Sequence, residues 1–233
     1  MTKITLLKPE QSHACGYFSD RQSHSLYVDP RLEPAIELLT QLNLNGFRRS
    51  GKLIYRPDCE GCNACQPVRI PVRQFKLKKS YKRTLRNARH WTLSVEMPSA
   101  ALYSDYANYI SQRHADGSMY PPSYDQYKEF LVDGHDNHRF LVARENGEFR
   151  ACLVFDLFLD GLSSVYCFFD PDYETLSPGS FMILKITQIC QLMGLPWHYL
   201  GYWVEGSRKM EYKSRYRPLH IFKNDQWQPF ETR

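Results

Sequence analysis

The sequence lacks acidic residues over one long segment. Between Gly61 and Val95 there is no Asp or Glu, whereas nine of the 30 Lys and Arg residues of the chain lie there. All 25 Asp and Glu residues lie elsewhere, so the rest of the chain is slightly acidic. A surface with charge of one sign attracts polyanions and contacts phosphates independently of sequence. We therefore expect a basic face that binds nucleic acid; a solvated surface helix is the alternative.

Long apolar runs and an export signal are also missing. The opening MTKITLLKPE becomes polar at once, unlike a signal peptide. No apolar stretch approaches the roughly 20 residues that a membrane span needs. We therefore expect a cytoplasmic protein with no membrane partner. With 42% hydrophobic and 24% charged residues, the 233-residue chain is typical of a globular protein with one or two cores.

The seven cysteines are an odd number, which argues against a disulfide framework. Cys59, Cys62 and Cys65 form a C-x-x-C-x-x-C run, a spacing seen in iron–sulfur proteins, but Arg69 holds the position of the expected fourth cysteine. Cys15 is a candidate fourth ligand for zinc or an iron–sulfur cluster with a structural or redox-sensing role. The alternative is a reduced, metal-free loop that is held by packing.

Hydrophobic periodicity predicts most of the secondary structure. Apolar residues at helical spacing predict helices over 32–42, 80–89 with Ser80 as N-cap, 102–113, 124–132, 179–193 and 207–213. Alternation predicts strands over 52–57 and 67–72, which their prolines should restrict to sheet edges or ends. Three antiparallel strands are expected between Arg139 and Phe169, joined by turns at Asn146-Gly147 and Asp160-Gly161. Further strands are expected over 197–204 and near 218–222.

This order of elements predicts an α+β fold with mixed, mainly antiparallel sheets flanked by helices. It resembles the GNAT acyltransferase superfamily, in which two central strands splay apart and admit an acyl donor. A boundary near Pro98 divides the chain into a cysteine-bearing part with the basic helix (1–98) and an acyltransferase-like part (99–233). The loop LSPGS lacks the glycine-bearing pyrophosphate signature of a CoA-dependent acetyltransferase, which weakens that alternative.

Three blocks of sequence resemble one family. GFRRSGKLIYRPDCEGCNACQPVRIPV, YISQRHADGSM and YLGYWVEGSRKMEYKSRYRP together resemble the bacterial aspartate/glutamate leucyltransferases, which are relatives of eukaryotic arginyl-tRNA–protein transferase. The resemblance implies an aminoacyltransferase that joins leucine from leucyl-tRNA to the α-amine of proteins beginning with Asp or Glu, marking them for N-degron degradation. An arginyl-tRNA donor and a non-enzymatic, cysteine-clustered RNA-binding protein are the alternatives.

The implied reaction is the attack of a neutral amine on an ester, which requires no cofactor. An acidic acceptor needs arginines, whose planar fork binds a carboxylate through two hydrogen bonds. Four arginines are candidates for binding the acceptor carboxylate: Arg48, Arg49, Arg56 and Arg69. At least one of them is expected to pair with a buried Asp or Glu instead. Contacts with tRNA are expected from Lys79, Lys82, Arg83, Arg86, Arg208, Lys209 and Lys213.

Four residues are candidates for the catalytic centre. Tyr202 and Trp203 are expected to stack on a terminal base of the tRNA or, alternatively, to lie in the core. Glu205 is a candidate proton acceptor or a helix cap. His114 is a candidate general base, with a favourable position at the C-terminus of a helix as the alternative.

Overall fold

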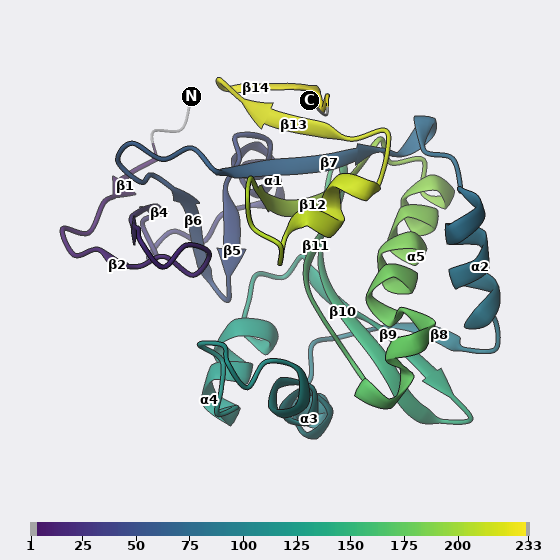
Figure 1. The fold of residues 1–233 in the computed structure, drawn as a ribbon. Helices are drawn as coiled ribbons and strands as arrows, with labels where there is room; N and C mark the ends of the chain where they lie inside the picture. The colour runs from purple at the N-terminus through teal and green to yellow at the C-terminus, as the bar shows by residue number, and fades with distance from the viewer. Residues whose placement is uncertain (1–3, 232–233) are drawn as a thin grey trace.

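An eight-stranded sheet forms the centre of the computed structural model, which describes residues 4–231 (Figure 1). Its order is β14-β13-β7-β12-β11-β10-β9-β8, and only β11 and β12 are parallel neighbours. The predicted α+β fold with mainly antiparallel strands is confirmed. The strands are β7 (Cys65–Pro71), β8 (Thr92–Glu96), β9 (His138–Glu145), β10 (Glu148–Phe158), β11 (Gly161–Phe169), β12 (Trp197–Val204), β13 (His220–Lys223) and β14 (Gln226–Pro229).

Helices cover both faces of this sheet. On one face lies α5 (Pro178–Leu192), and α2 (Lys79–Asn87) packs on the outer side of α5 (Figure 1). On the other face lie α3 (Tyr103–Arg113) and α4 (Tyr124–Tyr127). α4 continues into the π-helical turn η3 (Lys128–Val132). No helix within residues 4–231 is long and apolar enough to cross a membrane. Short 3-10 turns complete the chain: η1 (Val72–Gln74), η2 (Ala100–Leu102), η4 (Pro171–Leu176) and η5 (Glu211–Arg215).

The two covered faces explain why the middle of β9 is apolar on both of its sides. Successive side chains of a strand point to opposite faces. In β9, Leu141 and Ala143 therefore join the core under α5, whereas Phe140 and Val142 join the core under α3 and α4.

A four-stranded sheet, in the order β1-β4-β6-β5, carries the N-terminal part together with α1 (Ile36–Leu44). Gly51, in the turn between β5 and β6, fixes this sheet against η3. Its φ is +58°, and a Cβ there would lie 2.1 Å from the carbonyl oxygen of Glu129. The strands are β1 (Leu6–Leu7), β4 (Ser25–Val28), β5 (Arg48–Ser50) and β6 (Leu53–Pro57); β2 (His13–Ala14) and β3 (Gln22–Ser23) form a separate pair.

The strand over 67–72 was expected to have its prolines at a sheet edge or at a strand end. It is β7, which is not an edge strand because it lies between β12 and β13, whereas Pro71 is its last residue. β13 pairs only with Val68 and Arg69. Pro67 and Pro71 therefore have a neighbouring strand on one side alone, and a proline nitrogen that faces the open side costs no ladder hydrogen bond.

Three local predictions also change. The basic helix begins at Lys79 after Lys78 as N-cap, so Ser80 lies inside the helix and caps nothing. The second hairpin turn is formed by Leu159 and Asp160, since Gly161 already pairs with Phe158. The helix expected over 32–42 is shorter at its start and begins at Ile36.

The division of the chain near Pro98 stays a prediction. β7 and β8, which precede that residue, lie in the same sheet as the strands that follow it.

Candidate active site

β11 and β12 pair for only three residues and then separate. The paired residues are Gly161–Ser163 with Trp197–Tyr199. Gly161 permits the close approach, because a Cβ there would lie 2.4 Å from the carbonyl oxygen of Trp197. Beyond the separation lies a cavity of about 360 Å³, which we call the split cavity; it is lined by β11 and β12, by η3 and by α1, β5 and β6 of the N-terminal part.

Each of the two diverging strands carries an irregularity at the cavity. The register of β11 against β10 skips Val165, and that of β12 against β7 skips Leu200. Such bulges leave an extra residue outside the regular ladder and redirect its neighbours. The register therefore breaks on both strands at residues that line the split cavity.

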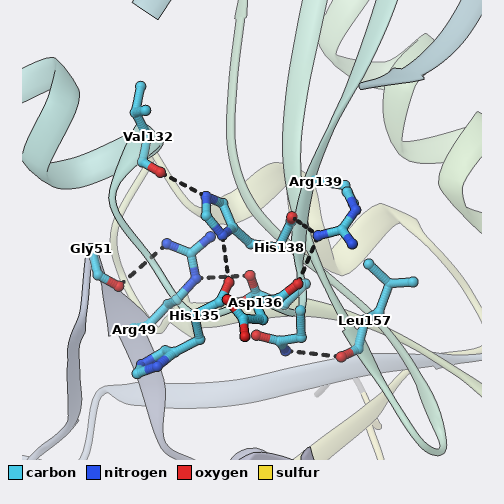
Figure 2. Close-up of polar contacts among 10 residues, drawn as sticks. Arg49, Gly51, Val132, His135, Asp136, His138, Arg139 and Leu157 are labelled. Atoms are coloured by element: carbon cyan, nitrogen blue, oxygen red, sulfur yellow. Dashed lines mark hydrogen bonds and ion pairs between the residues drawn. The ribbon is translucent and has the colours of Figure 1, made fainter. Parts of the chain in front are cut away.

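Three cations and one carboxylate line the split cavity. Arg49 donates from Nε to Asp156 at 2.8 Å, and the two side chains are each 5% exposed. Arg49 also donates to the carbonyl of Gly51 at 3.4 Å (Figure 2). Asp156 is thereby neutralised, and the other two cations, Arg48 and Lys213, have no carboxylate partner within residues 4–231.

Arg48 is held at one end and unpaired at the other. Its Nη1 donates to the carbonyl oxygens of Asn43 and Phe47 and to Asn43 Oδ1 at 3.0, 2.6 and 2.8 Å. Its Nε and Nη2 are buried and have no partner in the part of the chain that the structure describes. Burial lowers the pKa of Arg48, although nearby tyrosines oppose that shift. An unsatisfied buried donor is costly, so this end of Arg48 is suited to an anion.

Lys213 lies inside the protein and not on its surface. Its Nζ donates to the carbonyl oxygen of Tyr202 at 2.6 Å, and the residue is 7% exposed. Burial, followed by the charge of Arg48, lowers the pKa of Lys213 to about 7. Lys213 can therefore make its predicted contact with tRNA only if part of the tRNA enters the split cavity.

The predicted catalytic residues of β12 and the turn after it are placed apart. Tyr202 lines the split cavity, and its hydroxyl donates to the carbonyl of Gly46 at 2.8 Å. Trp203 packs instead against Phe230, with 4.8 Å between ring centroids. Glu205 is exposed and does not line the cavity. The structure thus brings only Tyr202 to the site, as a buried wall residue.

His114 does not line the split cavity. It is the C-cap residue of α3, and its Nε2 lies 3.1 Å from the hydroxyl of Tyr109. Burial, followed by the charge of Arg113, lowers the pKa of His114. The structure therefore places His114 at the C-terminus of α3 and outside the split cavity, and its role as a general base stays a prediction.

The four predicted acceptor arginines separate into two groups. Arg48 and Arg49 line the split cavity, and Arg49 is the one that pairs with a buried acid. Arg56 lies at a neighbouring cavity, where it donates to the carbonyl of Asn45 at 3.2 Å. Arg69 lies between two indole rings, 3.4 Å from the Trp197 centroid and 4.1 Å from that of Trp227. Its guanidinium stabilises the sheet by cation–π contacts and does not line the split cavity.

The predicted tRNA-binding residues of α2 form an exposed basic face, which makes no ion pair within the described residues 4–231. α2 lies beyond α5, away from the four-stranded sheet (Figure 1). Arg208 and Lys209 are exposed in the turn after β12. The face on α2 consists of Lys79, Lys82, Arg83 and Arg86.

The four clustered cysteines line a second cavity of about 640 Å³. Cys62 Sγ accepts a hydrogen bond from Arg21 Nη1 at 3.3 Å. The pKa of Cys62 is lowered, mainly by a backbone hydrogen bond from Ala64 and to a smaller extent by Arg21. Burial raises the pKa of Cys65 to about 12. Within residues 4–231 no group of three or more His, Cys, Asp or Glu is arranged to hold a metal ion. The thiols are unpaired, and the zinc or iron–sulfur site stays a prediction.

One polar arrangement at the split cavity was not predicted. Ser164, on β11, lies 2.8 Å from Nε2 of His198 on β12, and Nδ1 of that ring lies 2.9 Å from the hydroxyl of Thr187 on α5. Ser164 lines the cavity, whereas His198 and Thr187 are fully buried behind it. Sequence spacing did not reveal the three residues because they come from three different elements.

Comparison with known proteins shows the class to which the chain belongs. Two family models match the chain: the N terminus of arginine-tRNA-protein transferase over residues 13–83, and its C terminus over residues 100–223. The class is therefore that of the aminoacyl-tRNA–protein transferases.

Curated relatives define the family more closely. Aspartate/glutamate leucyltransferases of Hahella chejuensis and Stutzerimonas stutzeri are 42% and 44% identical to the chain. The matches cover 97% of this chain and 97% and 98% of those proteins. The chain belongs to the aspartate/glutamate leucyltransferase family, which confirms the resemblance found in its sequence.

A solved structure shares the fold. The crystal structure of FemX matches with a TM-score of 0.54 and 6% sequence identity, covering 94% of this chain and 86% of that chain. At this identity the likeness concerns the fold alone.

Proposed function

We propose that the protein transfers leucine from leucyl-tRNA to the α-amine of proteins that begin with Asp or Glu. The observation that carries the proposal is the split cavity, in which two diverging strands of a GNAT-like fold meet an apolar wall and the unpaired donors of Arg48. The names of the relatives agree with it. The product would enter an N-degron pathway in the cytoplasm.

The lining of the cavity favours leucine over arginine as the transferred residue. Among residues 4–231 its only carboxylate is that of Asp156, which is already paired with Arg49. A guanidinium from an arginyl donor would therefore meet Arg48 and Lys213 without a free acid to neutralise it. A leucyl side chain instead fits the apolar residues of the wall, which are Leu39, Leu42, Phe47, Ile54 and Phe158.

Arg48 is suited to the acidic side chain of the acceptor. Its free Nε and Nη2 are the two donors that an Arg fork presents to both oxygens of one carboxylate. Its Nη1 is already fixed by Asn43 and Phe47, so little side-chain freedom is lost on binding. An acceptor with Asp or Glu supplies the anion that the buried guanidinium lacks.

The chemistry is an aminolysis. The nitrogen of the acceptor forms a bond to the leucyl carbonyl carbon, the ester C–O bond breaks, and one amine proton passes to the departing ribose oxygen of the tRNA. The body of the tRNA would lie against the exposed basic face of α2, where phosphate contacts are independent of sequence. Alignment of the two substrates supplies much of the rate enhancement.

The test is a transfer assay with leucyl-tRNA and peptides that begin with Asp, Glu, Ala or Lys. We expect leucine on the Asp and Glu peptides only. Arg48→Met should raise the acceptor KM about tenfold or more, the equivalent of one lost charge-assisted contact. The KM for leucyl-tRNA should not change.

Arg31→Met is the matched control, since Arg31 is 86% exposed and pairs only with Asp29. Equal loss for donor and acceptor in Arg48→Met would contradict its role in binding the carboxylate. A wild-type protein that binds tRNA but transfers nothing would favour an RNA-binding module.

A further inference from the structure

The hydrogen-bond directions of the Thr187–His198–Ser164 chain follow from its inner end. The Thr187 hydroxyl donates to the carbonyl of Ile183, one turn earlier in α5, at 2.9 Å. The single hydroxyl hydrogen is thus used, and the Thr187 oxygen can only accept from His198 Nδ1 at 2.9 Å. Nδ1 of His198 therefore carries a hydrogen.

The imidazole of His198 is neutral. It is completely buried, its ring nitrogens contact no carboxylate in the part of the chain that the structure describes, and burial lowers its pKa to about 3. A neutral ring has one N–H, so Nε2 of His198 has only a lone pair. The Ser164 hydroxyl must then donate to Nε2 across the 2.8 Å contact. Ser164 consequently presents lone pairs, and no hydrogen, to the split cavity.

This polarity suits an amine. Ser164 is the first residue of β11 beyond its pairing with β12, at the apex of the split. Asn137 offers a second neutral acceptor in the lining. Its amide nitrogen donates to the carbonyl of Leu157 at 2.9 Å, and its Oδ1 is buried without a partner among residues 4–231. The nearby cations Arg48 and Lys213 favour the neutral form of an amine.

We propose that Ser164 accepts a hydrogen bond from the α-amine of the acceptor protein, and that His198 and Thr187 are positioning residues that fix the direction of this bond. The inference rests on the proposed leucyl transfer. An amine that donates N–H to Ser164 keeps its lone pair free to attack the leucyl carbonyl. A hydroxyl that pointed its hydrogen into the cavity would bind that lone pair and block the nucleophile.

The same geometry argues against Ser164 as a covalent nucleophile. Removal of its proton by His198 would create an imidazolium in a fully buried site, and Thr187 offers no negative charge to stabilise it. The hydrogen bonds from Thr187 through His198 therefore orient the Ser164 hydroxyl and do not activate it.

The test compares Thr187→Val with Thr187→Ser. Valine has nearly the shape of threonine but cannot accept from Nδ1, so His198 should take the other tautomer and donate to Ser164, which turns the Ser164 hydrogen into the cavity. We expect Thr187→Val to lower kcat/KM for the acceptor about tenfold, with the KM for leucyl-tRNA unchanged. Thr187→Ser should retain the wild-type values. Nitrogen-15 NMR of the substrate-free protein, assigned with His198→Asn, should show the tautomer change in Thr187→Val alone.

Ser164→Ala separates this role from packing. It should show the same acceptor defect, and Thr187→Val should add nothing in that background, since Thr187 acts only through Ser164. Additive losses, an unchanged tautomer in Thr187→Val, or an effect confined to leucyl-tRNA would each overturn the proposal. If the wild-type protein transfers no leucine, the proposed function is wrong. If the wild-type protein transfers leucine and Thr187→Val has wild-type acceptor kinetics, only the proposed role of Thr187, His198 and Ser164 is wrong.

Discussion

Lys213 and Arg48 are long charged side chains that the fold removes from water to line a cavity. Each leaves its charge without a carboxylate within the described residues, so each lowers the stability of the empty protein. A loss of stability of this kind is expected at a functional site, where a group of the substrate pairs with the buried charge.

The first prediction concerns the pH dependence that Lys213 produces. Its pKa falls from the ordinary 10.5 to about 7 in the folded protein, because burial opposes the charge. At pH 7 and below, the buried ammonium destabilises the fold in full. Between pH 7 and 10.5 the unfolded chain binds the proton and the folded protein does not, so stability rises with pH.

Lys213→Met should therefore be more stable than the wild type by the largest margin near pH 6. The margin should shrink by up to several kcal/mol as the pH approaches 10.5, at about 1.4 kcal/mol per unit of pKa shift. Urea unfolding of both proteins across this range measures the difference. A margin that does not vary with pH would show that Lys213 has an ordinary pKa.

The second prediction concerns the buried pair of Arg49 and Asp156. Asp156→Asn leaves the guanidinium of Arg49 uncompensated and should cost about 3–5 kcal/mol. The double change Arg49→Met with Asp156→Leu should recover most of this loss. As a surface control, Asp133→Asn breaks the exposed pair with Lys128 and should cost about 1 kcal/mol or less. Equal unfolding free energies for Asp156→Asn and the control would contradict the burial of the pair.

At the scale of elements, the close approach of β11 and β12 sets the origin of the split cavity. Gly161→Ala would place a Cβ 2.4 Å from the carbonyl oxygen of Trp197, so one strand must shift. We expect a loss of at least about 2 kcal/mol of unfolding free energy together with lower transfer activity. Gly179→Ala, at the start of α5, meets nothing within 4 Å and should be neutral or slightly stabilising. A neutral Gly161→Ala would refute the steric account.

Helix α2 is the second element with a prediction of its own. Changing Lys82, Arg83 and Arg86 to Ala should weaken tRNA binding and flatten its dependence on salt, because fewer counterions are released. The control changes to Ala three cations in the segments that connect the strands of the four-stranded sheet, which lies apart from α2 (Figure 1): Lys8, Arg31 and Lys52. Filter binding at several salt concentrations measures both variants. If the two variants behave alike, α2 is not the tRNA face.

At the scale of the whole molecule, local chemistry was predictable and long-range placement was not. The Asn146-Gly147 turn follows from residues that tolerate positive φ, and both have it, at 52° and 88°. β7 can lie inside the sheet because β13 pairs with only two of its residues, and the sequence of β7 does not reveal this short pairing. Strand separation and the neighbouring bulges likewise arise from pairing between distant segments.

The candidate site divides in the same way. The arginine-rich block predicted Arg48 and Arg49 as acceptor-binding residues, and both lie on β5 at the wall of the split cavity. Their binding of an acceptor stays a prediction. The sequence could not separate them from Arg69, whose position between Trp197 and Trp227 requires residues far along the chain. The Ser164–His198–Thr187 chain was missed for the same reason, because its members meet only when α5 packs on the sheet.

The most direct test of the account is a competition between leucyl-tRNA and arginyl-tRNA, differently labelled and at equal concentration, for one peptide that begins with Asp. The account predicts that leucine appears at the N-terminus and that arginine does not, because Asp156, the only carboxylate that the described residues bring to the split cavity, is already paired with Arg49. Transfer of arginine at a comparable rate would contradict both the donor assignment and this explanation of it.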